Sequence, residues 1–204
     1  MRAVNGIAIT TGRPGLQISV LEGHPEFLVR ELRSRRIEIV VGRLAFAEGD
    51  RDLDKEMLYD EQMAVIARRG HPLHDQRRLS LRGLRGQSWI LPPPDTAFYR
   101  QLAQSFEMAG VDVPPHSVRT LSTPVTLGLV ARTDAIAVVP RSILTLGSAS
   151  SEVQALRVKL PQATGPVGFV RLTEASASPA MLAFMDCCRT VVADILADWD
   201  HKKA

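Results

Sequence analysis

Polar side chains stand at the junctions where predicted strands run into predicted helices. Hydroxyl and carboxylate groups at such junctions cap helices, and the free N–H groups of a helix start attract carboxylates and other polar oxygens. Arginines beside them can pair with an acidic ligand. Each residue can also be only a cap or a turn residue, but recurrence over several junctions favours a binding cleft. The candidate site residues are Gly42, Arg43, Pro93, Asp95, Thr96, Ser122, Thr123, Pro140 and Arg141, with Gly42 and Pro140 shaping the walls.

Patterns typical of catalytic and metal sites are missing from the sequence. Gly147 and Ser148 lie in a run of small residues without the G-x-S-x-G context of a nucleophile. Cys187 and Cys188 are adjacent within a predicted helix, where packing is their expected role. The 5 histidines show no helical H-x-x-x-H spacing, and no glycine-rich phosphate loop follows a strand. We therefore expect no catalytic residue, no metal and no cofactor.

Arginines are concentrated in one polar connection, which contains Arg68, Arg69, Arg77, Arg78, Arg82 and Arg85 against a single Asp75. Such a cluster could touch a phosphate backbone. More often, such a cluster is an ordinary solvated face. The net charge of the chain is only +3, which argues against a dedicated nucleic-acid binder.

Short apolar runs alternate with helical periods along the chain. This alternation predicts parallel sheets with helices on their faces. About eight strands are many for one sheet, so two small α/β lobes are expected. The predicted strands cover residues 16–21, 37–41, one or two within 58–67, 89–91, 117–121, 135–139, 153–158 and 166–172; the predicted helices begin near residues 25, 97, 123 and 179.

The length and composition are those of an ordinary globular protein. The chain has 204 residues, of which 45% are hydrophobic and 23% charged. No apolar run is long enough for a signal-peptide core or a membrane helix. The two cysteines are neighbours and suggest no disulfide framework, so a cytoplasmic location is expected.

Four segments in a fixed order resemble the effector-binding domain of bacterial LysR-type transcriptional regulators. They are VRELRSRRIEIVVG, LYDEQMAVIARRGHPL, LRGQSWILPPP and RTLSTPVTLGLVARTDAIAVVPRSI. The last segment is the most specific, because it combines a strand, a Ser/Thr cap, a helix, and a short apolar strand that ends in proline. The resemblance extends over residues 16–199.

The resemblance implies an α/β fold of two Rossmann-like lobes joined by two crossover strands, as in type 2 periplasmic binding proteins. Lobe I would comprise residues 1–87 and 171–204, and lobe II residues 88–170. The effector, a sugar or an aromatic or other organic acid, would bind in the cleft between the lobes. A homodimer or higher homo-oligomer is implied as well.

The N-terminal end departs from the family pattern. The family begins with a winged helix-turn-helix and a linker helix, whereas only fifteen residues precede Leu16 here. The family's first effector-domain strand is also expected to be missing, with Val4 and Ile7 left from the helix after it. Part of the effector site would then be absent, and DNA would be bound only through a helix-turn-helix domain outside this chain.

The resemblance predicts a ligand-sensing regulatory domain that binds a small polar or anionic metabolite. Binding would change the angle between the lobes and so re-orient attached DNA-binding domains, provided that the ligand prefers one arrangement. The alternative is a solute-binding protein of a transport system, which has the same two-lobe architecture. A small α/β enzyme is a third reading, and it would need convergent acid, base or nucleophile residues.

Overall fold

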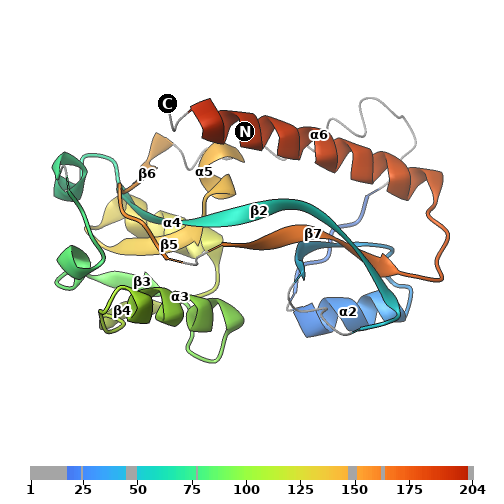
Figure 1. Cartoon of the computed structure of the whole chain (residues 1–204), viewed down its shortest axis with the longest axis horizontal. Coiled ribbons are helices and arrows are strands. Elements are labelled where there is room, and N and C mark those ends of the chain that lie inside the picture. The colour runs from blue at the N-terminus through green and yellow to red at the C-terminus, as the bar shows by residue number, and fades with distance from the viewer. Residues whose placement is uncertain are drawn as a thin grey trace. The chain divides into compact units, whose positions relative to one another are not determined.

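The structure is a computed structural model of the chain (Figure 1), and it describes residues 18–23, 25–44, 50–76, 78–146, 151–161 and 164–201. The chain divides into two compact units. Unit 1 comprises Met1–Glu61 and Gly165–Ala204, and unit 2 comprises Gln62–Thr164. Each unit has its own helices and its own hydrophobic core.

The sheet of unit 2 has a parallel centre. Strand β3 (Trp89–Leu91) pairs in parallel with β4 (His116–Arg119) and with β5 (Ile136–Pro140). The end of β2 (Leu53–Arg68) pairs antiparallel with β5 and with β6 (Val153–Ala155). The predicted parallel sheet is therefore confirmed for the central strands and wrong for β2 and β6. Parallel strands are usually connected through an α-helix. No α-helix is found between β2 and β3 in the part of the chain that the structure describes, so the strand–helix alternation that predicts parallel strands is missing at this step.

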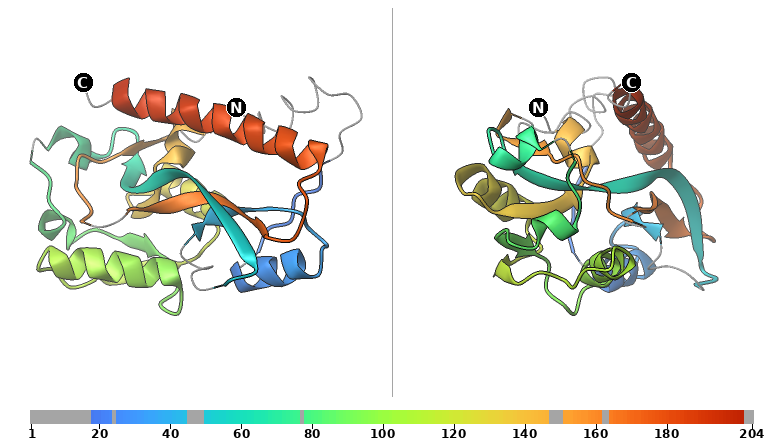
Figure 2. Two further views of the ribbon diagram at one scale, coloured as in Figure 1. Left: turned by 45° about the vertical axis from the view of Figure 1, so that its right-hand side comes forward. Right: turned by 60° about the vertical axis from the view of Figure 1, so that its left-hand side comes forward.

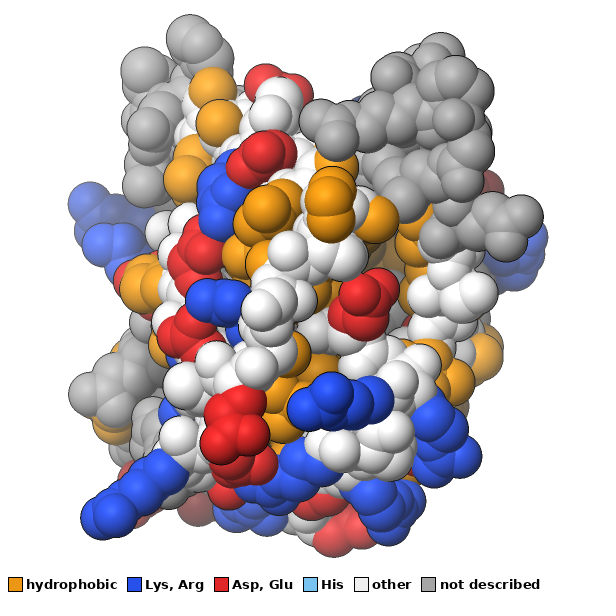
Figure 3. Space-filling view, turned by 90° about the vertical axis from the view of Figure 1, so that its right-hand side faces the viewer, with side chains coloured by type: hydrophobic (Ala, Val, Ile, Leu, Met, Phe, Trp, Pro, Cys, Tyr) orange, Lys and Arg blue, Asp and Glu red, His pale blue; other side chains and the backbone are white. Residues whose placement is uncertain are grey.

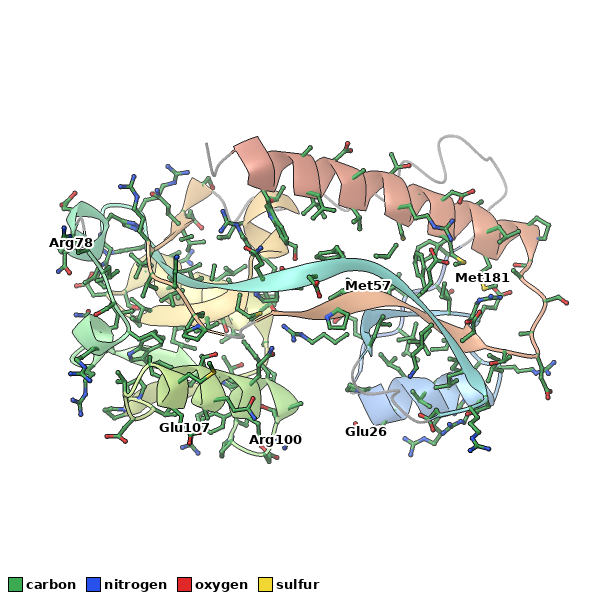
Figure 4. The ribbon with its side chains drawn as sticks, viewed as in Figure 1. Glu26, Met57, Arg78, Arg100, Glu107 and Met181 are labelled. Atoms are coloured by element: carbon green, nitrogen blue, oxygen red, sulfur yellow. The ribbon has the colours of Figure 1, made fainter. Side chains whose placement is uncertain are left out.

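Both faces of this sheet are apolar because alternate residues of each strand point to opposite sides. One face carries Val65, Trp89 and Ile136, which pack against α3 (Ala97–Met108). The opposite face carries their neighbours in sequence, such as Ile66 and Ile90, and packs against α4 (Thr123–Arg132) and α5 (Ser142–Leu146). Residues Arg100 and Glu107 mark the exposed side of α3 (Figure 4). Strands buried on both faces explain the uninterrupted apolar runs in the sequence.

The ends of the two longer helices of unit 2 follow the predicted signals. The hydroxyl of Thr96 accepts a hydrogen bond from the Tyr99 N–H and caps α3. The hydroxyl of Ser122 does the same for the Val125 N–H at the start of α4. Gly110 follows α3 with a φ of +64°, a conformation that glycine adopts without strain.

Unit 1 is a smaller sheet between two helices (Figure 2). Strand β1 (Val40–Arg43) pairs antiparallel with β7 (Thr164–Leu172), with Val40 opposite Val170. Helix α2 (Pro25–Arg33) packs on Val170, and helix α6 (Pro179–His201) packs on its neighbour Phe169. Because neighbouring residues of a strand point to opposite faces, the two helices lie on opposite sides of β7.

The predicted strand at residues 16–21 is wrong for its described part. Residues 18–21 are exposed and form no strand, and Val20 is 82% exposed. An extended apolar run becomes a strand only when a neighbouring strand pairs with it. No such pairing is found for these residues in the described part of the chain. Residues 16–17, Val4, Ile7, Arg77, Gly147 and Ser148 lie outside the described residues.

Two further predicted strands have different limits in the structure. The run expected at residues 37–41 becomes β1 at 40–43, where pairing with β7 begins. The run at 153–158 stops at Ala155, because the chain turns and the Val158 N–H donates to the Leu156 carbonyl. The alternation around Met63 belongs to one long strand, β2.

The chain passes between the units within strands. It leaves unit 1 inside β2, between Glu61 and Gln62, and returns at the start of β7, between Thr164 and Gly165. Residues 62–87, assigned above to lobe I, have their contacts within unit 2. The lobe boundaries of the sequence analysis stay a prediction.

Candidate functional site

The carboxyl ends of β3, β4 and β5 form one edge of the unit 2 sheet. Parallel strands end on the same side, so Leu91, Arg119 and Pro140 lie along this edge. The Thr120 N–H donates to the Leu91 carbonyl at 3.0 Å, which joins the first two strand ends. Helices α3 and α4 start beyond them, and in open α/β sheets this edge is where ligands bind.

A small hollow of about 40 Å³ lies at this edge. Its walls are apolar, apart from three threonines, and no charged side chain lines it. The lining residues are Ile90, Leu91, Pro92, Phe98, Thr120, Leu121, Thr123, Thr126, Val138, Val139 and Pro140.

The three threonine hydroxyls of the hollow differ in what they already bind. The Thr126 hydroxyl donates to the Ser122 carbonyl at 3.0 Å, and the Thr120 hydroxyl accepts from the Ser122 N–H at 3.0 Å. Within the described residues, the Thr123 hydroxyl has no hydrogen-bond partner. It is therefore the polar group of the hollow that is most available to a ligand.

Of the nine residues predicted for the site, Thr123 and Pro140 line this hollow. Arg141 follows directly, with its backbone N–H held by the Gln62 carbonyl at 2.7 Å. No partner of its half-buried guanidinium is found in the described part of the chain. A cation with no local counter-charge can pair with an anionic ligand at low cost.

Four more predicted residues belong to the loops before α3 and α4, and the side chains of two of them support backbone. The Thr96 hydroxyl donates to the Pro93 carbonyl at 2.7 Å, in addition to capping α3. The Ser122 hydroxyl is 3.4 Å from the Val125 nitrogen that it caps. Asp95 is exposed, and its backbone carbonyl accepts from Arg100. The cap interpretation thus accounts for Thr96 and Ser122.

The remaining two predicted residues, Gly42 and Arg43, lie in unit 1 on β1. Gly42 stands opposite Gly168, and Arg43 opposite Val167. Burial lowers the pKa of the Arg43 guanidinium, while the nearby Glu61 and Tyr59 act in the opposite direction. Glu61 is itself buried and accepts a hydrogen bond from the Tyr59 hydroxyl at 2.8 Å.

A larger cavity of about 670 Å³ lies in unit 1, between residues 18–21 and the edge of β1. Most of its lining side chains are apolar, and they come from residues 18–21, from Leu28, from residues 37–41 and from α6. Its charged groups are already engaged, since Arg36 pairs with Glu31 at 2.6 Å and Glu38 accepts from the Ser178 hydroxyl. On the face shown in Figure 3, hydrophobic side chains lie in the middle, among charged ones. This lining suits an apolar group better than a polar metabolite.

The sequence analysis missed Thr120, Thr126 and Phe98. Thr126 follows Thr123 by three residues, which places both on one face of α4, and this spacing was visible in the sequence. Thr120 and Phe98 reach the hollow through the way β4 and α3 pack on the sheet. No local pattern marks them.

The described residues contain neither a metal-binding cluster nor a membrane-spanning helix. No group of three or more His, Cys, Asp or Glu side chains there could hold a metal ion. None of the helices in those residues is long and apolar enough to cross a membrane.

Comparisons with known proteins agree on one family. The chain is similar to the HTH-type transcriptional regulator GalR of Pseudomonas putida, with 32% identity over 188 residues, which are 92% of this chain and 47% of that protein. It spans about half the length of the curated relatives that it matches. These relatives are transcriptional regulators and not transport proteins, which favours the first reading of the sequence over its alternative.

Solved structures share the fold. The regulatory domain of CcmR from Synechocystis PCC6803, in complex with 2-PG, superposes with a TM-score of 0.75 at 18% identity over 93% of this chain and 90% of that one. Full-length CbnR complexed with its target DNA gives a TM-score of 0.69 at 17% identity over 93% of this chain and 63% of that one. The predicted α/β fold of the type 2 periplasmic-binding-protein kind is confirmed. The family model of the LysR substrate binding domain matches residues 8–193, and the chain belongs to this family.

Proposed function

We propose that this chain is the effector-sensing domain of a LysR-type regulator and that it binds a small polar or anionic metabolite. The observation that carries the proposal is the edge of the unit 2 sheet at the carboxyl ends of β3, β4 and β5, where the small hollow lies. It combines apolar walls, the unpartnered Thr123 hydroxyl and, next to Pro140, the Arg141 guanidinium. A few convergent polar groups on an apolar concave surface are typical of metabolite sites.

The lining favours a ligand with two kinds of surface. A ring face or methylene groups would pack on Phe98, Leu121 and Pro140. A hydroxyl or carbonyl group would hydrogen-bond with Thr123, and a carboxylate would pair with Arg141. Sugars and aromatic or other organic acids have this combination. The proposed site in unit 2 consists of the predicted residues Pro93, Asp95, Thr96, Ser122, Thr123, Pro140 and Arg141, to which we add Phe98, Thr120 and Thr126. Gly42 and Arg43, which belong to unit 1, stay a prediction.

The wider biological role is proposed by similarity to the relatives. The CcmR regulatory domain holds 2-PG, which supports a small-molecule effector here. GalR is a transcriptional regulator, which supports coupling of this domain to a DNA-binding domain. We propose a cytoplasmic homo-oligomer whose ligand acts as a signal and is not converted. Such a signal requires unequal affinity of the ligand for two arrangements of the protein.

A thermal-shift screen of sugars and aromatic and organic acids tests the proposal. A ligand at 100 times its Kd stabilises by about 2.7 kcal/mol, which raises the Tm of a chain of this size by about 5–10 °C. Thr123→Val and Arg141→Gln should each reduce the shift produced by a hit. Thr190→Val and Arg132→Gln are the matched controls, because both side chains are exposed and outside the hollow.

Two outcomes would count against this site. If no compound stabilises the folded chain, the proposed effector function of this chain is not supported. If a compound stabilises the Thr123→Val and Arg141→Gln variants as much as the original chain, the ligand binds elsewhere.

A further inference from the structure

The net positive charge of the chain comes from one segment, residues 68–85. Residues 68–85 contain six arginines and one aspartate, whereas the other residues carry 19 basic and 21 acidic side chains. The rest of the molecule is thus slightly acidic, although the whole chain has a net charge of +3. Local asymmetry of this kind points to a partner with the opposite charge.

In the described residues of this segment, three leucines are buried and four arginines are exposed. The segment forms two short turns, η2 (Pro72–Asp75) and η3 (Arg82–Leu84). Leu73, Leu81 and Leu84 are buried in the core of unit 2. The four exposed arginines define what we call the basic face of unit 2: Arg69, Arg78, Arg82 and Arg85.

Hydrogen bonds hold the backbone under this face. The buried His71 accepts a hydrogen bond at Nδ1 from the Leu73 N–H, and its Nε2 lies 3.2 Å from the Asp134 carbonyl oxygen. The Nε2 atom of His74 lies 3.1 Å from the Arg68 carbonyl oxygen, which joins η2 to the end of β2. These hydrogen bonds fix the backbone of residues 71–74 beside the face.

Little of the charge of Arg78, Arg82 and Arg85 is neutralised within the described residues. Arg68, beside the face, is paired with Asp134 at 2.7 Å. Arg85 is 3.9 Å from Asp112, and both side chains are largely exposed, so this ion pair is weak. Within the described residues no carboxylate pairs with Arg78 or Arg82, and Arg82 donates to the Gly110 carbonyl at 3.4 Å. Figure 4 shows Arg78 on the loop between the two turns, away from the strands of unit 2.

We propose that the basic face of unit 2 binds the phosphate backbone of duplex DNA without sequence preference. Guanidinium groups match phosphate oxygens in charge and geometry, and such contacts carry no base information. The segment 68–85 contains no Trp, Tyr or Phe, so it lacks the stacking groups of a single-strand site. CbnR, a solved structure of the same fold, is complexed with its target DNA. The proposal does not depend on effector binding.

Salt titration of the 204-residue chain on a duplex of arbitrary sequence tests this face. Four phosphate contacts predict a slope of log K against log salt of about −3.6, which is a loss of roughly 100-fold in affinity between 50 and 200 mM salt. The triple variant R78Q/R82Q/R85Q should lose about 2.7 of that slope. The charge-preserving triple variant R78K/R82K/R85K should keep the slope, which separates charge from folding.

The control is a second triple glutamine variant with the same net charge as R78Q/R82Q/R85Q. R30Q/R51Q/R132Q also removes three exposed arginines, from α2, the turn before β2 and α4, and should keep the slope. If both glutamine variants weaken binding equally, affinity follows net charge alone and the proposed face is wrong. The proposal is also wrong if the unaltered chain does not bind the duplex at low salt. Equal binding to heparin or to anionic vesicles would overturn the assignment to DNA.

Discussion

Arg33 on α2 donates two hydrogen bonds to the carboxylate of Asp52, from Nε to Oδ2 at 2.7 Å and from Nη2 to Oδ1 at 2.9 Å. The same guanidinium bonds Asp50 at 2.8 Å. One arginine therefore joins α2 to the chain that enters β2. The hydrogen bonds from Arg33 lower the pKa of Asp52 below its ordinary value.

This pair predicts an acid-sensitive part of the stability of unit 1. Because the folded pKa of Asp52 is depressed, its contribution is present above the unfolded pKa and is lost as the pH falls through the folded pKa. We expect Asp52→Asn to lower the Tm at neutral pH and to flatten the fall in Tm as the pH drops below the ordinary aspartate pKa of about 4. Asp60→Asn, an exposed residue of the same strand, should leave that fall unchanged. An Asp52→Asn variant with the original pH dependence would contradict the assignment.

Gly168 on β7 has no room for a side chain. A Cβ atom there would collide with the carbonyl oxygen of Glu56 and would lie 3.0 Å from the Met57 Cα atom. Both belong to the backbone of β2, which cannot move aside without disturbing the sheet. Gly168→Ala should therefore destabilise the chain by about 3 kcal/mol, at the upper end of overpacking effects. Gly86→Ala is the control, because nothing lies within 4 Å of its added Cβ atom. Denaturant titrations of the two variants should differ clearly, and equal stability would mean that β7 and β2 are farther apart.

Local signals in the sequence predicted the starts of α3 and α4 and the central strands of unit 2. Thr96 and Ser122 cap the expected helices, and the apolar runs at 89–91 and 136–140 are strands. These features depend on short-range chemistry, namely capping hydroxyls, prolines at helix starts and strands buried on both faces. The same chemistry placed Thr123 and Pro140 at the hollow.

Features that depend on long-range pairing could not be read from the sequence. Residues 18–21 have the composition of a strand, yet whether they pair depends on a neighbour elsewhere in the chain. The direction of β2 against β5 is set by the connection between them and not by residues 62–68 themselves. Phe98 and Thr120 reach the hollow only because α3 and β4 pack beside it.

The two tryptophans should respond differently to the same change. Trp89 is fully buried, and its Nε1 donates to the Leu84 carbonyl at 3.2 Å. Trp199 is also buried, and its Nε1 has no partner in the described part of the chain. A buried N–H without a partner costs about 1–3 kcal/mol, and phenylalanine removes it. Trp199→Phe should therefore destabilise less than Trp89→Phe.

Denaturant titration followed by far-UV circular dichroism measures both variants, because the fluorescence signal changes with each substitution. We expect Trp89→Phe to cost about 1–3 kcal/mol more than Trp199→Phe, since it leaves the Leu84 carbonyl unpaired. The Trp199 ring also packs edge-on against Tyr59, with ring centroids 5.9 Å apart, and phenylalanine can keep that contact. Equal losses of unfolding free energy in the two variants would show that the Trp199 Nε1–H has a hydrogen-bond partner.

The Cys188 thiol should react slowly with alkylating reagents in the folded chain. Burial raises its pKa to about 11, the neighbouring Cys187 adds to this effect, and Arg189 opposes it. Thiolates and not thiols react with alkylating reagents, so at neutral pH the reactive fraction falls by on the order of 100-fold relative to an ordinary thiol. In a Cys187→Ser variant, alkylation of Cys188 should be slow in buffer and fast in denaturant, as followed by mass spectrometry. The rate should rise tenfold for each pH unit up to about pH 10, because the thiol remains mostly protonated over that range. Alkylation at equal rates in buffer and in denaturant would mean that the Cys188 thiol is not buried on the core side of α6.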